Sequence, residues 1–194
     1  FIHRRNGYLM PLMYLSVYRD DCTMSPTYLL KICTVGAASV GKTSIIIRYS
    51  TGAFREHYSP TLGTGFAYKK MKLGANFVNA QIWDLGSQDF LERVRANYYI
   101  GTQGVIFMFD VTSWESLNAV EDWKNEVDRH VDDYQALLVA NKIDLVDERV
   151  VSTSEGKEMA SKLGMGYIEV SVMLDKNVNE AFELISTRIC DSFV

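Results

Sequence analysis

Residues 36–43 read G-A-A-S-V-G-K-T and directly follow an apolar run at 28–35, which gives the pattern G-x-x-x-x-G-K-[ST] in a strand, loop, helix order. Glycines at both ends let the backbone curl until successive N–H groups point at a polyphosphate, and the helix that begins near Lys42 adds its positive dipole end. A glycine-rich turn with an incidental lysine is the alternative. The pattern predicts a nucleoside triphosphate site in a fold where a strand leads into a helix.

The side chains at the end of this loop have distinct expected roles. Lys42 is expected to neutralise the outer phosphates, and the hydroxyl of Thr43 is expected to hold a magnesium ion. We expect the nucleotide to be contacted here by Gly36, Ala38, Ser39, Val40, Gly41, Lys42, Thr43 and Ser44.

The base is indicated by N-K-I-D at 141–144, which follows an apolar run at 136–140. The carboxylate of Asp144 can accept two hydrogen bonds from the ring N1–H and the exocyclic amine of guanine, and adenine does not present these donors on that edge. A site built for those donors leaves a buried charge unmatched when adenine enters. Taken alone, Asn141, Lys142 and Asp144 could form a polar turn. After a phosphate loop, they predict guanine.

Apolar runs alternate with helical patterns along the chain, which predicts an α/β fold with helices on both faces of a six-stranded, mostly parallel sheet. The turn L-G-A-N at 73–76 reads as a hairpin, so one strand is expected to be antiparallel. Ser152 with Glu155, and Asn177 with Glu180, have the spacing of capping boxes. Strands are expected at 28–35, 66–73, 77–83, 105–110, 136–141 and 167–170, and helices at 42–50, 90–99, 114–132, 153–163 and 178–191.

Composition agrees with one domain. The chain has 194 residues, 47% of them hydrophobic, which is enough for a substantial core. The 20 Lys and Arg against 24 Asp and Glu give a net charge of −4, so charge does not predict a nucleic-acid partner. Cys22, Cys33 and Cys190 have the spacing of no metal site, which favours a reduced, cytoplasmic protein.

These residues resemble the Ras-like small GTPases, and most closely the Rab branch, from about Tyr28 to the C-terminus. The stretches L-G-T-G-F at 62–66 and A-N-Y-Y-I-G at 96–101 are similar to Rab sequences. The resemblance implies a P-loop GTPase domain over 24–194 that binds GTP or GDP with Mg²⁺ and hydrolyses GTP slowly. Residues 1–23 are expected to be an extension that is disordered or not native.

The resemblance also implies the remaining site residues. In the first switch, at 54–61, Phe54 would cover the guanine, and Tyr58 and Thr61 would contact the nucleotide, with Thr61 also reaching magnesium. In the second switch, at 82–89, Asp84 would hold magnesium through water and Gln88 would orient the attacking water. The loop that follows the last strand would contribute Ser171, Val172 and Met173 to the base site.

The second switch departs from the family pattern. Ser87 stands where the family has the glycine whose N–H contacts the γ-phosphate, and a residue with a Cβ has fewer backbone states. Gly86 replaces an alanine and Leu85 a threonine, so flexibility could have moved by one position. We hypothesise slow or altered hydrolysis. Val172 replaces a small alanine, which predicts weaker base binding, whereas Ala38 is read as neutral.

Phe66, Trp83 and Tyr98 match an aromatic triad by which Rab-like proteins meet effectors, although aromatics on strands also serve simple packing. The resemblance further implies an exchange factor, a GTPase-activating protein and a monomeric state. Cys190 is fifth from the end, so no C-a-a-X box is encoded in the chain as written. Endomembrane attachment is expected only if a lipidated tail is missing.

Three functional classes therefore remain open. The first is a Rab-like switch in membrane traffic. The second is a GTP-binding interaction protein that hydrolyses GTP poorly, as Ser87 suggests. The third is a P-loop ATPase or kinase, against which the N-K-x-D sequence argues.

Overall fold

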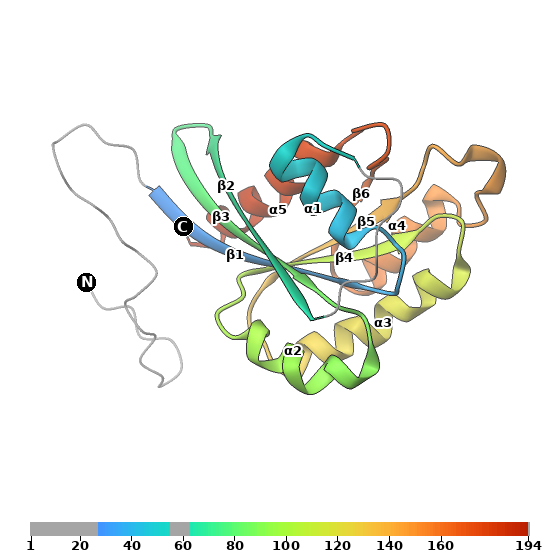
Figure 1. Ribbon diagram of the computed structural model, residues 1–194, viewed down its shortest axis with the longest axis horizontal. Coiled ribbons are helices and arrows are strands. Elements are labelled where there is room, and N and C mark those ends of the chain that lie inside the picture. Colours follow the sequence, from blue (N-terminus) through green and yellow to red (C-terminus); the bar gives the residue numbers. More distant parts are fainter. Residues whose placement is uncertain (1–26, 55–62, 194) are drawn as a thin grey trace, which may run out of the picture.

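The computed structural model describes residues 27–54 and 63–193, so the predicted extension at 1–23 lies outside the described residues. Its sheet has the strand order β2-β3-β1-β4-β5-β6, with β2 antiparallel to β3 and the other neighbours parallel (Figure 1). The strands are β1 (Thr27–Gly36), β2 (Thr64–Leu73), β3 (Asn76–Leu85), β4 (Gly104–Asp110), β5 (Gln135–Asn141) and β6 (Gly166–Glu169). The predicted fold class and its single antiparallel strand are confirmed.

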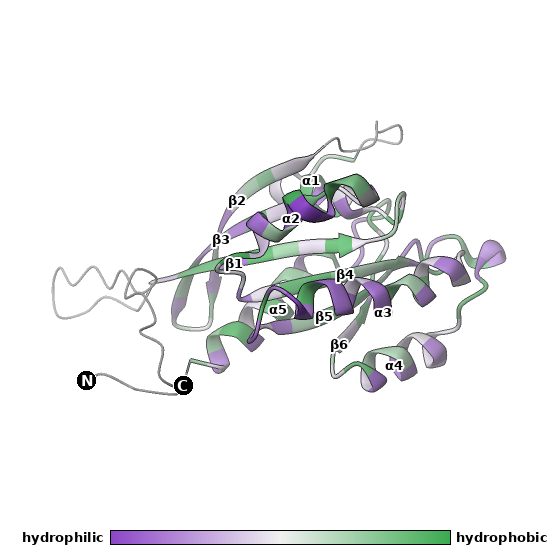
Figure 2. Ribbon diagram, turned by 90° about the horizontal axis from the view of Figure 1, so that it is seen from below, coloured by the Kyte–Doolittle hydropathy of each residue, from purple (hydrophilic) through white to green (hydrophobic). Residues whose placement is uncertain are grey.

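Helices cover both faces of this sheet (Figure 1). They are α1 (Lys42–Thr51), α2 (Glu92–Tyr99), α3 (Trp114–Asp128), α4 (Thr153–Lys162) and α5 (Val178–Asp191), with short 3₁₀ turns η1 (Asp89–Leu91) and η2 (Val146–Glu148). Side chains of β1 alternate between two cores: Leu30 and Ile32 pack in the cluster that includes α1 and α5, and Cys33 and Val35 pack in the one that includes α3. Figure 2 shows β1 largely green, as expected for a strand covered on both faces.

The hairpin turn and one of the two predicted capping boxes are present. Gly74 takes a φ of 58°, which suits a tight turn between β2 and β3. The side chain of Ser152 accepts from the N–H of Glu155, and the Glu155 carboxylate accepts from the N–H of Ser152, which completes a capping box. The predicted box at Asn177 is wrong, because Asn177 has a φ of 60° and its side chain does not cap α5. It donates instead to the carbonyl of Glu169 at 2.8 Å.

Two helices, α2 and α3, differ from the prediction by more than one residue at a boundary. α3 ends at Asp128 rather than at 132, and the N–H groups of His130 and Val131 both donate to the carbonyl of Val127, at 2.9 Å, where the chain leaves the helix. The helix predicted at 90–99 is divided into η1 and α2, since the N–H of Leu91 donates to the carbonyl of Gln88, three residues earlier. The carboxyl ends of the parallel strands still meet along one edge of the sheet, where such folds bind ligands.

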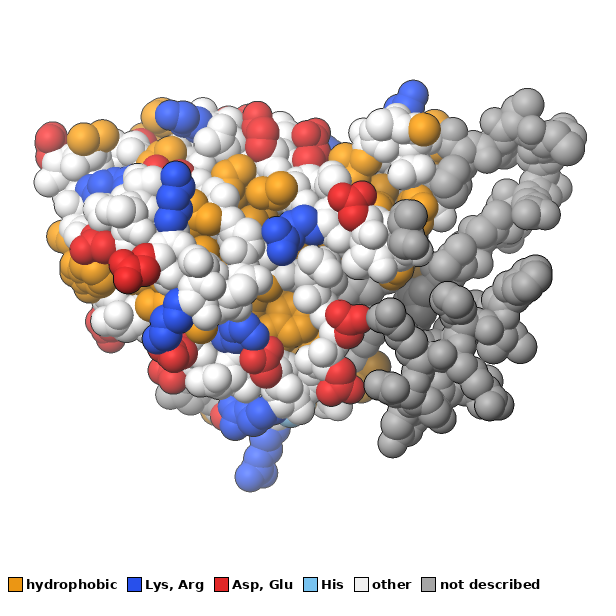
Figure 3. Space-filling model, turned by 180° about the vertical axis from the view of Figure 1, so that it is seen from behind, with side chains coloured by type: hydrophobic (Ala, Val, Ile, Leu, Met, Phe, Trp, Pro, Cys, Tyr) orange, Lys and Arg blue, Asp and Glu red, His pale blue; other side chains and the backbone are white. Residues whose placement is uncertain are grey.

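The surface is of mixed charge. On the face shown in Figure 3, acidic and basic side chains are interspersed, with hydrophobic patches between them. None of the helices in the described part of the chain is long and apolar enough to cross a membrane.

Candidate functional site

The phosphate loop after β1 has two glycines that no other residue could replace without a clash. Gly36 has a φ of 143°, and a Cβ there would lie 2.3 Å from the carbonyl oxygen of Met108 on β4. Gly41 has a φ of 103°, and its Cβ would lie 2.3 Å from the Asn141 side-chain nitrogen. Both glycines of the predicted motif are thus required by backbone conformation and by close approach. Ser39 also takes a positive φ, of 63°.

Lys42 lies at the start of α1 and is almost entirely buried. Its Nζ donates to the carbonyls of Gly36 and Ala37, at 2.7 and 2.6 Å, so the ammonium lies inside the loop that the motif forms. Burial lowers the pKa of Lys42 to about 8, although the nearby carboxylate of Asp84 acts in the opposite direction. A cation held in this way is suited to neutralise an anion that enters the loop.

Thr43 and Asp84 come from different elements and meet. Thr43 Oγ1 donates to Asp84 Oδ2 at 2.5 Å, and Asp84 stands near the end of β3, opposite Thr34 of β1. A hydroxyl and a carboxylate oxygen are hard ligands of the kind that Mg²⁺ takes, usually one or two from protein and the rest from phosphate and water. The residues present therefore fit this metal.

The N-K-x-D residues follow β5 and contact two other loops. Asn141 Nδ2 donates to the carbonyl of Val40 at 2.9 Å, and Asn141 Oδ1 accepts from the N–H of Val172 at 3.2 Å. Asp144 Oδ1 accepts from the Ser171 hydroxyl at 2.5 Å. Lys142, with a φ of 67°, pairs its Nζ with Asp110 Oδ2 at 2.5 Å. The predicted phosphate and base residues thus come together through Asn141.

Val172, in the loop after β6, is buried and still uses its backbone N–H in a hydrogen bond. The side chain is buried in the core that includes α1 and α5, while the N–H donates to Asn141. The hydrogen bond between this N–H and Asn141 is present in spite of the larger side chain. The weaker base binding stays a prediction.

Arg48 of α1 supports the same loop and was not identified from the sequence. Its Nε donates to the carbonyl of Val172 at 3.0 Å, and its Nη2 to the carbonyl of Met173 at 2.9 Å. The guanidinium also lies 5.2 Å from the ring centre of Phe54, the last described residue before position 63. Since Arg48 lies more than a hundred positions from Val172 and belongs to no local motif, no sequence pattern points to it.

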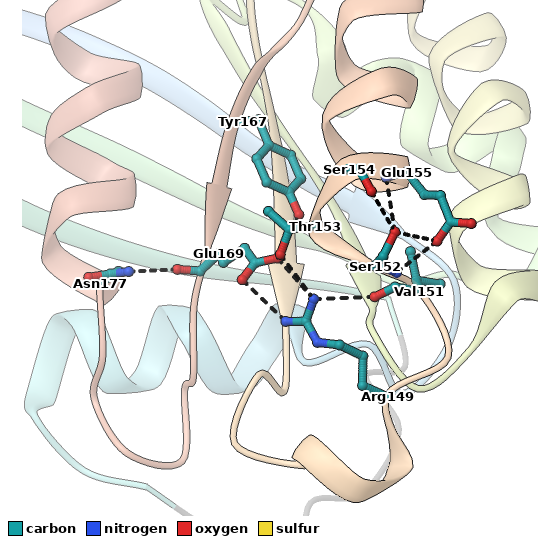
Figure 4. Close-up of polar contacts among 9 residues, drawn as sticks. All are labelled: Arg149, Val151, Ser152, Thr153, Ser154, Glu155, Tyr167, Glu169 and Asn177. Carbon is teal, nitrogen blue, oxygen red and sulfur yellow. Dashed lines mark hydrogen bonds and ion pairs between the residues drawn. The ribbon is translucent and has the colours of Figure 1, made fainter.

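A second polar network anchors this loop at the end of β6 (Figure 4). The carboxylate of Glu169 accepts from Arg149 at 3.0 and 3.2 Å, from Thr153 at 2.7 Å and from Tyr167 at 3.0 Å. Partial burial raises the pKa of Glu169, but these hydrogen bonds outweigh it and hold the pKa below its usual value. Asn177 closes the network from the far end of the loop, so the segment between them is held at both ends.

The second switch, at 82–89, begins in the last residues of β3 and continues into the loop after it. Ser87 is not among the four described non-glycine residues with positive φ, so its Cβ causes no strain in this conformation. Gly86 is needed for room: a Cβ there would lie 2.8 Å from Gln88 Oε1 and 2.8 Å from the carbonyl oxygen of Gly63. The glycine at 86 is therefore explained by close packing, and not by a φ that only glycine adopts.

The three predicted aromatic residues lie in contact on β2, β3 and α2. The ring centres of Phe66 and Trp83 are 5.1 Å apart, and those of Trp83 and Tyr98 are 5.4 Å apart. Phe66 is 56% exposed. The other first-switch residues of the prediction, Tyr58 and Thr61, lie outside the described residues.

Comparison with known proteins agrees with this geometry. Residues 31–191 match the model of the Ras family. The chain is 38% identical to the Ras-related protein Rab-3A of Homo sapiens over 165 residues. This match covers 84% of this chain and 75% of that protein. It is 36% identical over 174 residues to Rab-3C of Bos taurus, covering 89% and 77%, and 38% identical over 174 residues to Rab-3B of Bos taurus, covering 89% and 80%. The chain therefore belongs to the Ras family, as a Rab-like small GTPase and GTP hydrolase.

Proposed function

We propose that this protein is a GTP/GDP switch in which Asn141 joins base recognition to phosphate binding. The supporting observation is that one side chain contacts both Val40 of the phosphate loop and Val172 of the base loop. Asp144 would read the two guanine donors, with Ser171 holding its second oxygen in place. Val172, Met173 and Phe54 would complete the base site, and Lys42 and Thr43 the phosphate site.

The chemistry proposed for this site is in-line attack of water on the γ-phosphorus, in which the protein supplies positioning and charge. Lys42 and the loop amides would take up charge on the phosphate oxygens, and Gln88 would place the water. Thr43 and Thr61 would hold magnesium directly and Asp84 would hold it through water, and the bound ion would supply positive charge to the site. The N–H of Ser87 and the side chain of Thr61 would sense the γ-phosphate.

We expect slow intrinsic turnover. Arg95 of α2 contacts the backbone of the second switch, but its guanidinium is paired with Glu126 at 2.7 Å instead of being free to meet a phosphate. A partner's arginine would then accelerate hydrolysis by about 10³–10⁵-fold. Exchange factors and effectors are the other proposed partners, and the contiguous Phe66, Trp83 and Tyr98 would form an effector surface. A peripheral position on endomembranes fits a function in vesicle traffic.

A second candidate function rests on Ser87. If the loop must pass through a positive φ during the cycle, serine raises the energy of that state, and the protein remains bound to GTP as an interaction module. The two candidates use the same site and differ in turnover.

Competition and single-turnover measurements on the full chain would test both candidates. We expect GTP and GDP, but not ATP, to displace a fluorescent guanine nucleotide in the presence of magnesium. Phosphate release from the parent would then be compared with Ser87→Gly, with the exposed Ser154→Gly in α4 as the matched control.

The second candidate predicts a slow parent and a Ser87→Gly variant that is about tenfold faster, because a positive φ costs a non-glycine residue roughly 1–2 kcal/mol and glycine almost nothing. Equal rates for the parent and both variants would refute the impaired-hydrolysis candidate. Displacement by ATP as efficient as by GTP would refute the guanine switch itself.

A further inference from the structure

A buried ion pair links α2 to α3 beneath the second switch. Arg95 Nε and Nη2 donate to the two carboxylate oxygens of Glu126, both at 2.7 Å, and the Tyr99 hydroxyl donates to Glu126 Oε1 at 2.8 Å. Arg95 and Glu126 are 3% and 7% exposed. The guanidinium also lies 4.7 Å from the ring centre of Trp123 on α3. Its orientation is therefore fixed by charge, by two parallel hydrogen bonds and by an aromatic face.

The remaining nitrogen of this guanidinium holds the switch backbone. Arg95 Nη1 donates to the carbonyl of Gly86 at 2.9 Å and to the carbonyl of Gln88 at 2.8 Å, so its two bonds fall on either side of Ser87. A trans peptide is planar, and its N–H points opposite to its C=O. Because Arg95 fixes the direction of the Gly86 carbonyl, it also fixes the direction of the Ser87 N–H.

The same short loop is also anchored through its backbone. The N–H of Gly86 donates to the carbonyl of Gly63 at 2.9 Å, which ties the loop to the start of β2. α3 is packed against β4 and β1 and provides the fixed frame from which Glu126 holds Arg95. The loop is thus held between β2 on one side and, through one arginine, α3 on the other.

Stability alone does not explain such a pair. Replacing a buried ion pair with apolar residues of similar volume is often neutral or stabilising. Apolar residues, however, could not supply the two bonds from Nη1 to the loop. The feature that the charged pair adds is therefore the orientation of the peptides at 86–88.

We propose that Arg95 and Glu126 are positioning residues of the second switch, which hold the Ser87 N–H and Gln88 ready for a nucleotide that carries a γ-phosphate. This inference rests on the proposed function, because it assigns these residues to support Ser87 and Gln88. Without the pair, the protein must order the loop when GTP binds. The free-energy cost of that ordering lowers the affinity for GTP but not the affinity for GDP.

Two variants of the full chain test the proposal. The triple variant Arg95→Met, Tyr99→Phe and Glu126→Leu replaces the buried polar cluster and leaves no unpaired phenol in it. Arg95→Lys keeps a charge for Glu126 but lacks the forked guanidinium that reaches both carbonyls. The matched control is Glu92→Gln with Arg129→Gln, because this exposed pair also joins α2 to the end of α3, at 3.0 Å. If the triple variant does not fold, Arg95→Lys carries the test.

The readouts are the affinities for GDP and for a non-hydrolysable GTP analogue, together with single-turnover hydrolysis. Both Arg95 variants should lose about tenfold in GTP-analogue affinity, while GDP affinity stays within about twofold of the parent. Hydrolysis should slow by at least about tenfold, since misplacing catalytic groups has effects of that order. The control variant should match the parent in all three.

Each contrary outcome has a distinct meaning. Equal losses for GDP and the GTP analogue would overturn the proposal, because the pair would then support only the fold. Unchanged values in folded variants would overturn it as well. A parent that binds neither nucleotide would refute the proposed function and this inference together, whereas a parent that binds and hydrolyses GTP beside unaffected variants would refute the inference alone.

Discussion

The proposed base end and the proposed γ-phosphate end of the nucleotide site are held in different ways. At the base end, Asn141, Ser171 and Arg48 make several side-chain hydrogen bonds that join the loops after β1, β5 and β6. At the other end, the described contacts of the Gly86 and Gln88 peptides are with the carbonyl of Gly63, the guanidinium of Arg95 and the N–H of Leu91. The loops proposed to meet GTP and GDP alike are thus joined by side chains from several distant elements, whereas the loop proposed to respond to the γ-phosphate is joined to α3 through the guanidinium of Arg95.

The sharpest test of this difference is Asp144→Ala. Two charge-assisted hydrogen bonds to guanine would be lost, which predicts a fall of at least about 10²-fold in affinity for GTP and GDP alike. Isothermal titration with both nucleotides measures it, and the exposed Asp147→Ala serves as the control. A change in the ratio of GTP to GDP affinity would show that the two ends are not separate.

A smaller loss is expected from Arg48→Met. The variant removes the bonds to Val172 and Met173 but keeps a long apolar side chain, so the base loop loses support without a large cavity. We expect about tenfold faster release of fluorescent GDP and of a fluorescent GTP analogue, corresponding to roughly one hydrogen bond's net contribution. Arg129→Met, on an exposed arginine, controls for charge. Faster release of the GTP analogue alone would contradict the comparison.

The smallest effect concerns pH. Burial raises the pKa of Glu126, but hydrogen bonds from Arg95 and Tyr99 outweigh burial, and the pKa in the folded protein lies below the ordinary 4.5. The stabilisation from Glu126 is therefore complete above 4.5 and is lost as pH falls through the folded pKa.

Chemical denaturation across this range, with GDP and magnesium present, should show the parent and Glu126→Gln converging as the pH falls. The exposed Glu92→Gln should follow the parent at every pH. A gap between the parent and Glu126→Gln that stays constant below 4.5 would show that the charge of Glu126 does not contribute.

The sequence predicted the frame and the ligand-facing motifs because these are local. A strand followed by G-x-x-x-x-G-K-T, or by N-K-x-D, fixes both an element and the residues at its carboxyl end. The supporting residues could not be found in this way. Arg48 reaches Val172 across 124 positions and Arg95 reaches Glu126 across 31, and neither pair has a pattern of spacing. Asn177 failed as a cap because it takes a φ of 60° and its side chain donates to the carbonyl of Glu169, eight positions earlier, a contact that the three-residue spacing of a capping box does not reveal.

The contact between Asn141 and Val40 spans 101 positions of the chain, and this has a consequence for biosynthesis. A ribosome adds about 5–20 residues per second, so the phosphate loop leaves the ribosome roughly 5–20 s before the asparagine that contacts it. Ser171 and the strand before it follow later still. The nascent chain therefore carries a complete G-K-T motif several seconds before it carries the residues at 141–144 and 171–173 that would complete the proposed nucleotide site.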